Sequence, residues 1–90
     1  MLVLPEAITQ ANAVACLTAL SKALTLEGTA DVVLDAARLS RFDSAALAVL
    51  LEVRRHVLKM GKEFAVKDAP QRLQDLAALY GIAELLPSKA

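Results

Sequence analysis

Three stretches of the chain repeat their apolar residues with the period of an α-helix. The first runs from about Gln10 to Leu24, with Thr9 as its expected N-terminal cap and an apolar stripe of Val14, Leu17, Leu20 and Leu24. The second runs from Ser44 to about Met60, and its expected buried face consists of Leu47, Leu50, Leu51, Val53, Val57 and Leu58. The third starts near Pro70 and carries a stripe of Leu73, Leu76, Ala77 and Tyr80. The pattern therefore predicts three amphipathic helices.

Short apolar runs without this period precede the three helical stretches, at residues 2–4, 32–34 and 64–66. Pro5 ends the first run, and Gly28 supplies the turn before the second. The run from Val32 to Leu34 is continuously apolar, which is typical of a central strand covered on both faces. The resulting order, βαβαβα, predicts an α/β fold with a mostly parallel sheet and right-handed helical crossovers. Because 90 residues suffice for one modest core, we expect a single domain over residues 1–90.

Composition adds an indication of complex formation. Hydrophobic residues make up 57% of the chain and aromatic residues only 3%, with a mean hydropathy of +0.49. A domain this small holds few of them in its interior, so some are expected to form a patch that binds another protein. The ten basic and ten acidic residues cancel. This balance argues against nucleic acid, and against an anionic membrane surface, as direct partners.

The residue types that carry chemistry are too sparse for an active site. The single cysteine, Cys16, falls in the apolar pattern of the first helix and is expected to be a small buried hydrophobe in a reducing compartment. The single histidine, His56, shares the polar face of the second helix with Glu52 and Lys59. Neither has partners at metal-ligand spacing, and the three glycines are isolated. We therefore expect no enzyme, no metal and no cofactor, and we identify neither a signal peptide nor a membrane span.

The candidate site is the loop at residues 36–43 and the start of the helix that follows it. Loops that leave the carboxyl ends of parallel strands hold the sites of open α/β sheets. The hydroxyl of Ser44 is expected to accept from the first N–H groups of the helix, a cap worth about 1 kcal/mol. The same hydroxyl is a candidate for phosphorylation, which the helix dipole favours and the neighbouring Asp43 opposes. The small residues Ala45, Ala46 and Ala48 leave room for a neighbouring backbone.

A sequence pattern across this loop and helix start is the most specific feature of the chain. The apolar strand ends in Asp35, and it is followed by Leu39-Ser40 and then by Phe42-Asp43-Ser44-Ala45-Ala46-Leu47. This pattern resembles the STAS domains, named after sulfate transporters and anti-sigma factor antagonists, and the match continues to about Leu86. Within that family, residues 76–82 and the short ending are most similar to the small stand-alone, MlaB-like STAS subunit of Mla-type phospholipid ABC transporters.

The resemblance implies a non-catalytic subunit that binds the cytoplasmic ATPase of such a transporter, regulates or stabilises it, and serves outer-membrane lipid asymmetry. It places the contact at the start of the second helix, where we expect the partner-binding residues Arg41, Phe42, Asp43, Ser44, Ala45 and Ala48. The protein would then be cytoplasmic, and peripheral to the inner membrane only through its complex. The alternative that the resemblance leaves open is an anti-sigma factor antagonist, in which a partner kinase phosphorylates the serine matching Ser44.

Three departures from the family pattern affect what is expected of the fold. Ala46 stands where many members have glycine, and Pro5 stands near a glycine common in the family. The usual opening strand of the family is missing, which leaves the sheet a strand short. A free sheet edge of this kind can pair with a second copy, so a homodimer is also expected as an alternative state.

Overall fold

The computed structural model describes residues 2–26 and 31–89, and the turn expected at Gly28 lies outside them. The chain begins with the short strands β1 (Leu2–Val3) and β2 (Ala7–Ile8), followed by the helix α1 (Ala13–Leu26). The strands β3 (Asp31–Asp35) and β4 (Arg41–Phe42) precede the helix α2 (Ser44–Lys59). The remaining elements are β5 (Glu63–Lys67), α3 (Gln71–Leu79), the short 3-10 helix η1 (Ala83–Leu85) and β6 (Ser88–Lys89). The predicted α/β class and its three helices are confirmed.

Four strands form a parallel sheet in the order β1-β3-β5-β6. The strand β3 lies inside this sheet, as its apolar run predicts, and it pairs along its whole length with β5, with Val33 opposite Ala65. The sequence does not predict β6, because a two-residue strand shows no apolar period. This strand forms where the backbone N–H of Val66 donates to the oxygen of Pro87 at 2.8 Å. The strand β1 is one edge of the sheet, and pairing of two copies at this edge stays a prediction.

A second, two-stranded parallel sheet joins β2 to β4, with Ile8 opposite Phe42. The expectation of a loop throughout residues 36–43 is therefore wrong for Arg41 and Phe42. The pairing forms because the fully buried side chain of Ile8 fixes β2 to the core. In addition, the backbone oxygen of Glu6 accepts from the backbone N–H groups of Ser40 and Arg41, at 2.9 and 3.1 Å. These contacts fix the chain immediately before α2.

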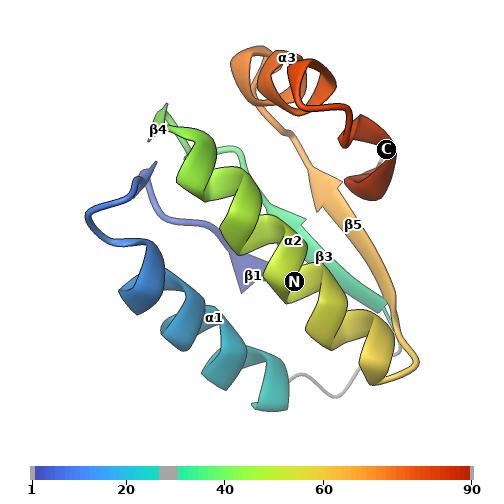
Figure 1. The fold of residues 1–90 in the computed structure, drawn as a ribbon. Helices are drawn as coiled ribbons and strands as arrows, with labels where there is room; N and C mark the ends of the chain where they lie inside the picture. Colours follow the sequence, from blue (N-terminus) through green and yellow to red (C-terminus); the bar gives the residue numbers. More distant parts are fainter. Residues whose placement is uncertain (1, 27–30, 90) are drawn as a thin grey trace.

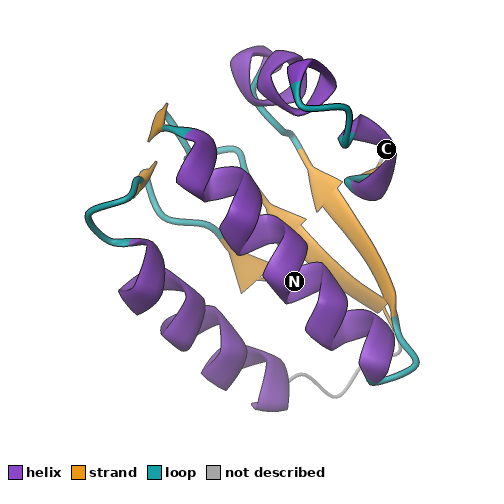
Figure 2. Ribbon diagram, viewed as in Figure 1, coloured by secondary structure: helices purple, strands orange, loops and turns teal. Residues whose placement is uncertain are grey.

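The helices α1 and α2 lie side by side across one face of the four-stranded sheet, and α3 lies near the carboxyl end of β5 (Figure 1). Figure 2 shows the same two layers, with helices in front of strands. Alternate strand residues point into the layer between them, and the largest fully buried side chains are Leu4, Ile8, Leu34, Leu50, Leu73, Val32, Val53 and Val57. Val33 points to the other face and is only half buried. The expectation that both faces of this strand are covered is therefore wrong.

The helix α1 begins later than its sequence pattern indicates. The predicted burial of Leu20 and Leu24 is confirmed, whereas that of Val14 is wrong. The backbone oxygen of Asn12 accepts from the N–H of Cys16 at 2.9 Å, and its side-chain oxygen accepts from the N–H of Thr9 at 2.7 Å. Thr9 is therefore not the cap. Val14 is 80% exposed, because the buried residues follow a four-residue spacing that leaves it on the opposite side of the helix: Cys16, Leu20 and Leu24.

The helix α2 has its predicted bounds, and its buried residues are Ala46, Leu47, Val49, Leu50, Val53 and Val57. Leu58 is exposed rather than buried, because it is rotated by about 100° around the helix from Val57.

The sequence predicts Tyr80 in the buried stripe of α3, but the helix ends at Leu79 and the tyrosine is 58% exposed. The turns after α2 and α3 contain Gly61 and Gly81 at φ +75° and +73°, which glycine adopts without steric cost.

Candidate functional site

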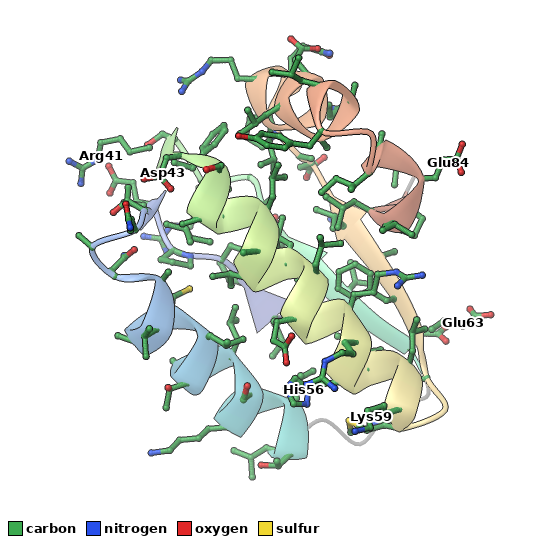
Figure 3. All side chains as sticks on the ribbon, viewed as in Figure 1. Arg41, Asp43, His56, Lys59, Glu63 and Glu84 are labelled. Atoms are coloured by element: carbon green, nitrogen blue, oxygen red, sulfur yellow. The ribbon has the colours of Figure 1, made fainter. Side chains whose placement is uncertain are left out.

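The expected contact residues gather at one end of the molecule, where α2 begins. Figure 3 shows Arg41 and Asp43 at this end, whereas His56 and Lys59 lie toward the other end of α2. Asp43 is the single residue between β4 and α2. The site is therefore built on a strand that leads directly into a helix, with the segment before α1 on one side and α3 on the other.

Asp43 caps α2 and ties it to the segment before α1. Its backbone is extended, with φ −127° and ψ −167°, which directs the side chain back onto the helix start. The atom Oδ1 accepts from the backbone N–H of Ala45 at 2.9 Å, and Oδ2 accepts from that of Gln10 at 3.1 Å. The backbone oxygen of Asp43 also accepts from the N–H of Ala46 at 3.0 Å. One residue therefore fixes both the first turn of α2 and its position relative to a distant segment.

Ser44 does not cap the helix, so the expectation drawn for its hydroxyl is wrong. It is the first residue of α2, and the carboxylate before it already occupies the capping position. Capping requires a non-helical backbone just before the first turn, and Asp43 has that conformation. Ser44 is exposed, and its hydroxyl makes no hydrogen bond within residues 2–26 and 31–89. The hydroxyl is therefore free to bond with another molecule.

The three alanines of the first turns differ in their surroundings. Ala46 is fully buried, Ala45 is half buried, and Ala48 is exposed. A four-residue spacing places Ala48 on the same helix face as Ser44, so the surface of α2 at this point consists of a hydroxyl and a methyl group. Side chains this small let a partner approach the helix backbone closely. Ala46, in contrast, belongs to the core and is not available for contact.

Phe42 connects the start of α2 to α3. Its side chain is half buried and packs against the core, whereas Arg41 before it is exposed. The guanidinium carbon of Arg72, on α3, lies 4.9 Å from the centroid of the Phe42 ring, which is the geometry of a cation–π contact. The sequence does not reveal Arg72 as part of this site, because a contact between a strand and a distant helix has no periodic signature. The surroundings of the candidate site therefore include a residue of α3 that the sequence does not predict there.

The polar residues along α2 are engaged with one another rather than with a reaction centre. The Nε of Arg55 donates to Glu52 at 3.1 Å, and His56 Nε2 lies 3.4 Å from the same carboxylate. The hydrogen bond from Arg55 lowers the pKa of Glu52, and the same bond raises the pKa of Arg55. Side chains three and four positions apart on an exposed helix face form such pairs routinely. His56 is partly exposed and lies in this surface cluster, as the sequence predicts.

Cys16 is buried, as predicted, and burial raises the pKa of its thiol, which makes it a poor nucleophile. In the part of the chain that the structure describes, no three His, Cys, Asp or Glu side chains are placed to hold a metal ion. Each helix in residues 2–26 and 31–89 is too short or too polar to traverse a lipid bilayer.

The chain was compared with known proteins and with protein-family models. No curated protein is similar enough in sequence to count as a match. The protein-family model described as "Mlab, STAS domain" matches residues 1–87, which is nearly the whole chain and includes every element of the site at the start of α2.

Proposed function

Because this chain belongs to the family of MlaB-like STAS domains, we propose that it is a non-catalytic subunit of a Mla-type phospholipid ABC transporter. It binds the cytoplasmic ATPase of that transporter and regulates or stabilises it, and through this role it contributes to outer-membrane lipid asymmetry. The protein is then cytoplasmic and reaches the inner membrane only through its complex. Its contact surface is centred on Ser44 and comprises Arg41, Phe42, Asp43, Ser44, Ala45 and Ala48.

The main observation behind this proposal is that Ser44 and Ala48 lie together on one exposed face of α2, at a helix start that Asp43 holds in place. The serine hydroxyl is not used within the described part of the chain. The backbone beneath it is held by the Asp43 cap, and the preceding strand is held by Glu6. A surface ordered before binding loses less conformational entropy when a partner docks, so its few polar and apolar contacts yield more affinity.

The proposal is tested by measuring the affinity of the purified chain for the ATPase encoded with it. Ala48→Arg and Ser44→Arg each place a long side chain on the proposed contact and should weaken binding by at least about tenfold. Val14→Arg is the control, because Val14 is also exposed but lies on α1. Unchanged affinity of the doubly substituted chain, with its fold intact by circular dichroism, would contradict the proposed site.

The free hydroxyl of Ser44 also supports a second candidate function, that of a phosphorylated anti-sigma factor antagonist. The helix dipole favours a phosphate on Ser44, but a neighbouring charge opposes it. The Asp43 carboxylate already accepts from the N–H of Ala45 and carries negative charge next to Ser44, so a phosphate would meet repulsion there. Incubation with the partner kinase and ATP, followed by intact-mass measurement, distinguishes the two functions. A single added phosphate that is absent in Ser44→Ala would favour the antagonist.

A further inference from the structure

A shallow groove of about 330 Å³ lies beside the proposed contact, on the side of α3. It is lined by Phe42 from β4 and by Arg72, Asp75, Leu76 and Leu79 from α3. Arg72, Leu76 and Leu79 follow the spacing i, i+4, i+7, which places them on one face of α3. The groove therefore joins one face of a helix to a residue that already belongs to the proposed contact surface.

The outer part of α3 exposes large apolar side chains that the fold does not use. Leu73 and Ala77 bury the inner face of this helix. Leu79, in contrast, is 80% exposed, and the adjacent Tyr80 is also largely exposed. Single exposed apolar residues are ordinary, but Leu79 lines a groove to which Phe42 and Leu76 also contribute. Such an arrangement is typical of a surface that another protein covers.

The charge on this rim indicates the chemistry of the partner. Arg72 stacks on Phe42 but forms no ion pair with any residue that the structure describes. The nearby Asp75 accepts from the side-chain amide of Gln71 at 2.9 Å. The guanidinium is therefore held in one place by the ring while its charge is not neutralised by the chain. A planar guanidinium in this position is suited to a carboxylate from the other side of the interface.

We propose that the ATPase-binding surface continues from α2 across Phe42 onto the outer face of α3. The groove receives a segment of the ATPase that places an apolar side chain against Phe42, Leu76 and Leu79 and a carboxylate against Arg72. This inference rests on the proposed function, because it names a second half of the same contact. Phe42 is the residue that makes the two halves continuous, since it lies in β4 beside α2 and lines the groove.

The test is the affinity of the full chain for its ATPase at low and high salt, with single substitutions on α3. Leu79→Ser removes the apolar anchor and should weaken binding by about tenfold or more. Arg72→Glu should weaken binding most at low salt and reverse the contribution of this pair to the salt dependence, because the proposed ion pair becomes a pair of like charges whose repulsion salt screens. Val14→Ser is the matched control, since Val14 has the same exposed fraction as Leu79, and it should leave the affinity within about twofold.

The outcomes separate this inference from the proposed function. If Ala48→Arg abolishes binding while Leu79→Ser and Arg72→Glu leave it unchanged, the contact is confined to α2 and the inference is wrong. If the wild-type chain does not bind the ATPase, both proposals are wrong. If Leu79→Ser changes the self-association of the isolated chain but not its affinity for the ATPase, the groove receives a second copy and the inference is again overturned.

Discussion

The carboxylate of Asp43 accepts the backbone N–H of Gln10, a residue 33 positions earlier, at 3.1 Å. The other carboxylate oxygen accepts from Ala45 and caps α2. A single exposed side chain therefore fixes the first turn of α2 and the segment that leads into α1. Ser44 lies in that first turn and Ala48 lies one turn further along the same face. The geometry of the proposed contact therefore depends on Asp43, whose carboxylate oxygens both bond within the chain.

Replacement of Asp43 by alanine should lower the free energy of unfolding by about 1–2 kcal/mol, because it removes the cap of α2 together with the bond to Gln10. Ser44→Ala should change it by less than about 0.5 kcal/mol, because this exposed hydroxyl bonds to nothing in the described chain. Urea denaturation followed by circular dichroism measures both. Asp43→Asn should lose less than Asp43→Ala, because asparagine caps helices as well as aspartate does but has no second oxygen to accept from Gln10. A larger loss for Ser44→Ala than for Asp43→Ala would show that the cap is wrongly assigned.

Asp68 adopts a left-handed backbone conformation, with φ +55°, directly after β5. Aspartate and asparagine tolerate this region far better than β-branched residues do. Asp68→Val should therefore lower the free energy of unfolding by about 1–2 kcal/mol, although the residue is exposed. Asp68→Asn should leave it within about 0.5 kcal/mol. Equal stabilities of the two variants in a thermal melt would argue against the left-handed conformation.

The burial of Cys16 predicts a pH dependence of stability. Burial raises the pKa of the thiol in the folded chain above its usual value of 9.0, so the folded chain holds this proton more tightly than the unfolded chain does. The contribution of Cys16 is therefore fully present below pH 9 and is lost as the pH rises through the folded pKa. Denaturation of the wild type and of Cys16→Ala at pH 7, 9 and 10.5 isolates the effect. The wild type should lose more stability than the variant over this range, and parallel losses would reject the explanation.

The buried face of α1 can be checked by two truncations of similar chemistry. Leu20→Ala should lower the free energy of unfolding by about 2–4 kcal/mol, because the side chain of Leu20 is buried where α1 packs on the core. Val14→Ala should change it by less than about 0.5 kcal/mol, since Val14 is exposed. Chemical denaturation gives both values. A substantial loss for Val14→Ala would show that Val14 belongs to the buried stripe, as its spacing from the leucines predicts.

The sequence predicts the large elements of this fold because each has a clear period or an apolar run. The central position of β3 and the bounds of α2 follow from such patterns. The strands β2 and β6 are not predicted, since two-residue strands depend on the pairing of backbone groups brought together by the rest of the fold. In the predicted stripe of α1, Leu20 and Leu24 are buried but Val14 is not, because Val14 is as apolar as the buried residues and only contact with α2 and the sheet distinguishes them.

In the candidate site too, the sequence predicts the segment but not the contacts that form when distant elements pack. The segment from Arg41 to Ala48 is identified from the sequence through its resemblance to a family. Asp43 and Ser44 are both residue types that cap helices, so the sequence does not decide which of them is the N-cap. The extended backbone of Asp43 decides it in the structure. The Phe42–Arg72 contact joins β4 to α3, so it exists only once both have packed against the core.

The pairing register of β3 bears on how the chain reaches this structure. Leu2 pairs with Leu34 and Val32 pairs with Phe64, so each neighbour of β3 lies 32 positions away along the chain. Both pairings require loops of the same length to close, at nearly the same entropic cost, and neither can form from local contacts. We therefore expect the rate of folding to be limited by long-range search rather than by helix formation. With equal loops on both sides, the polypeptide has no entropic preference for which half of the sheet assembles first.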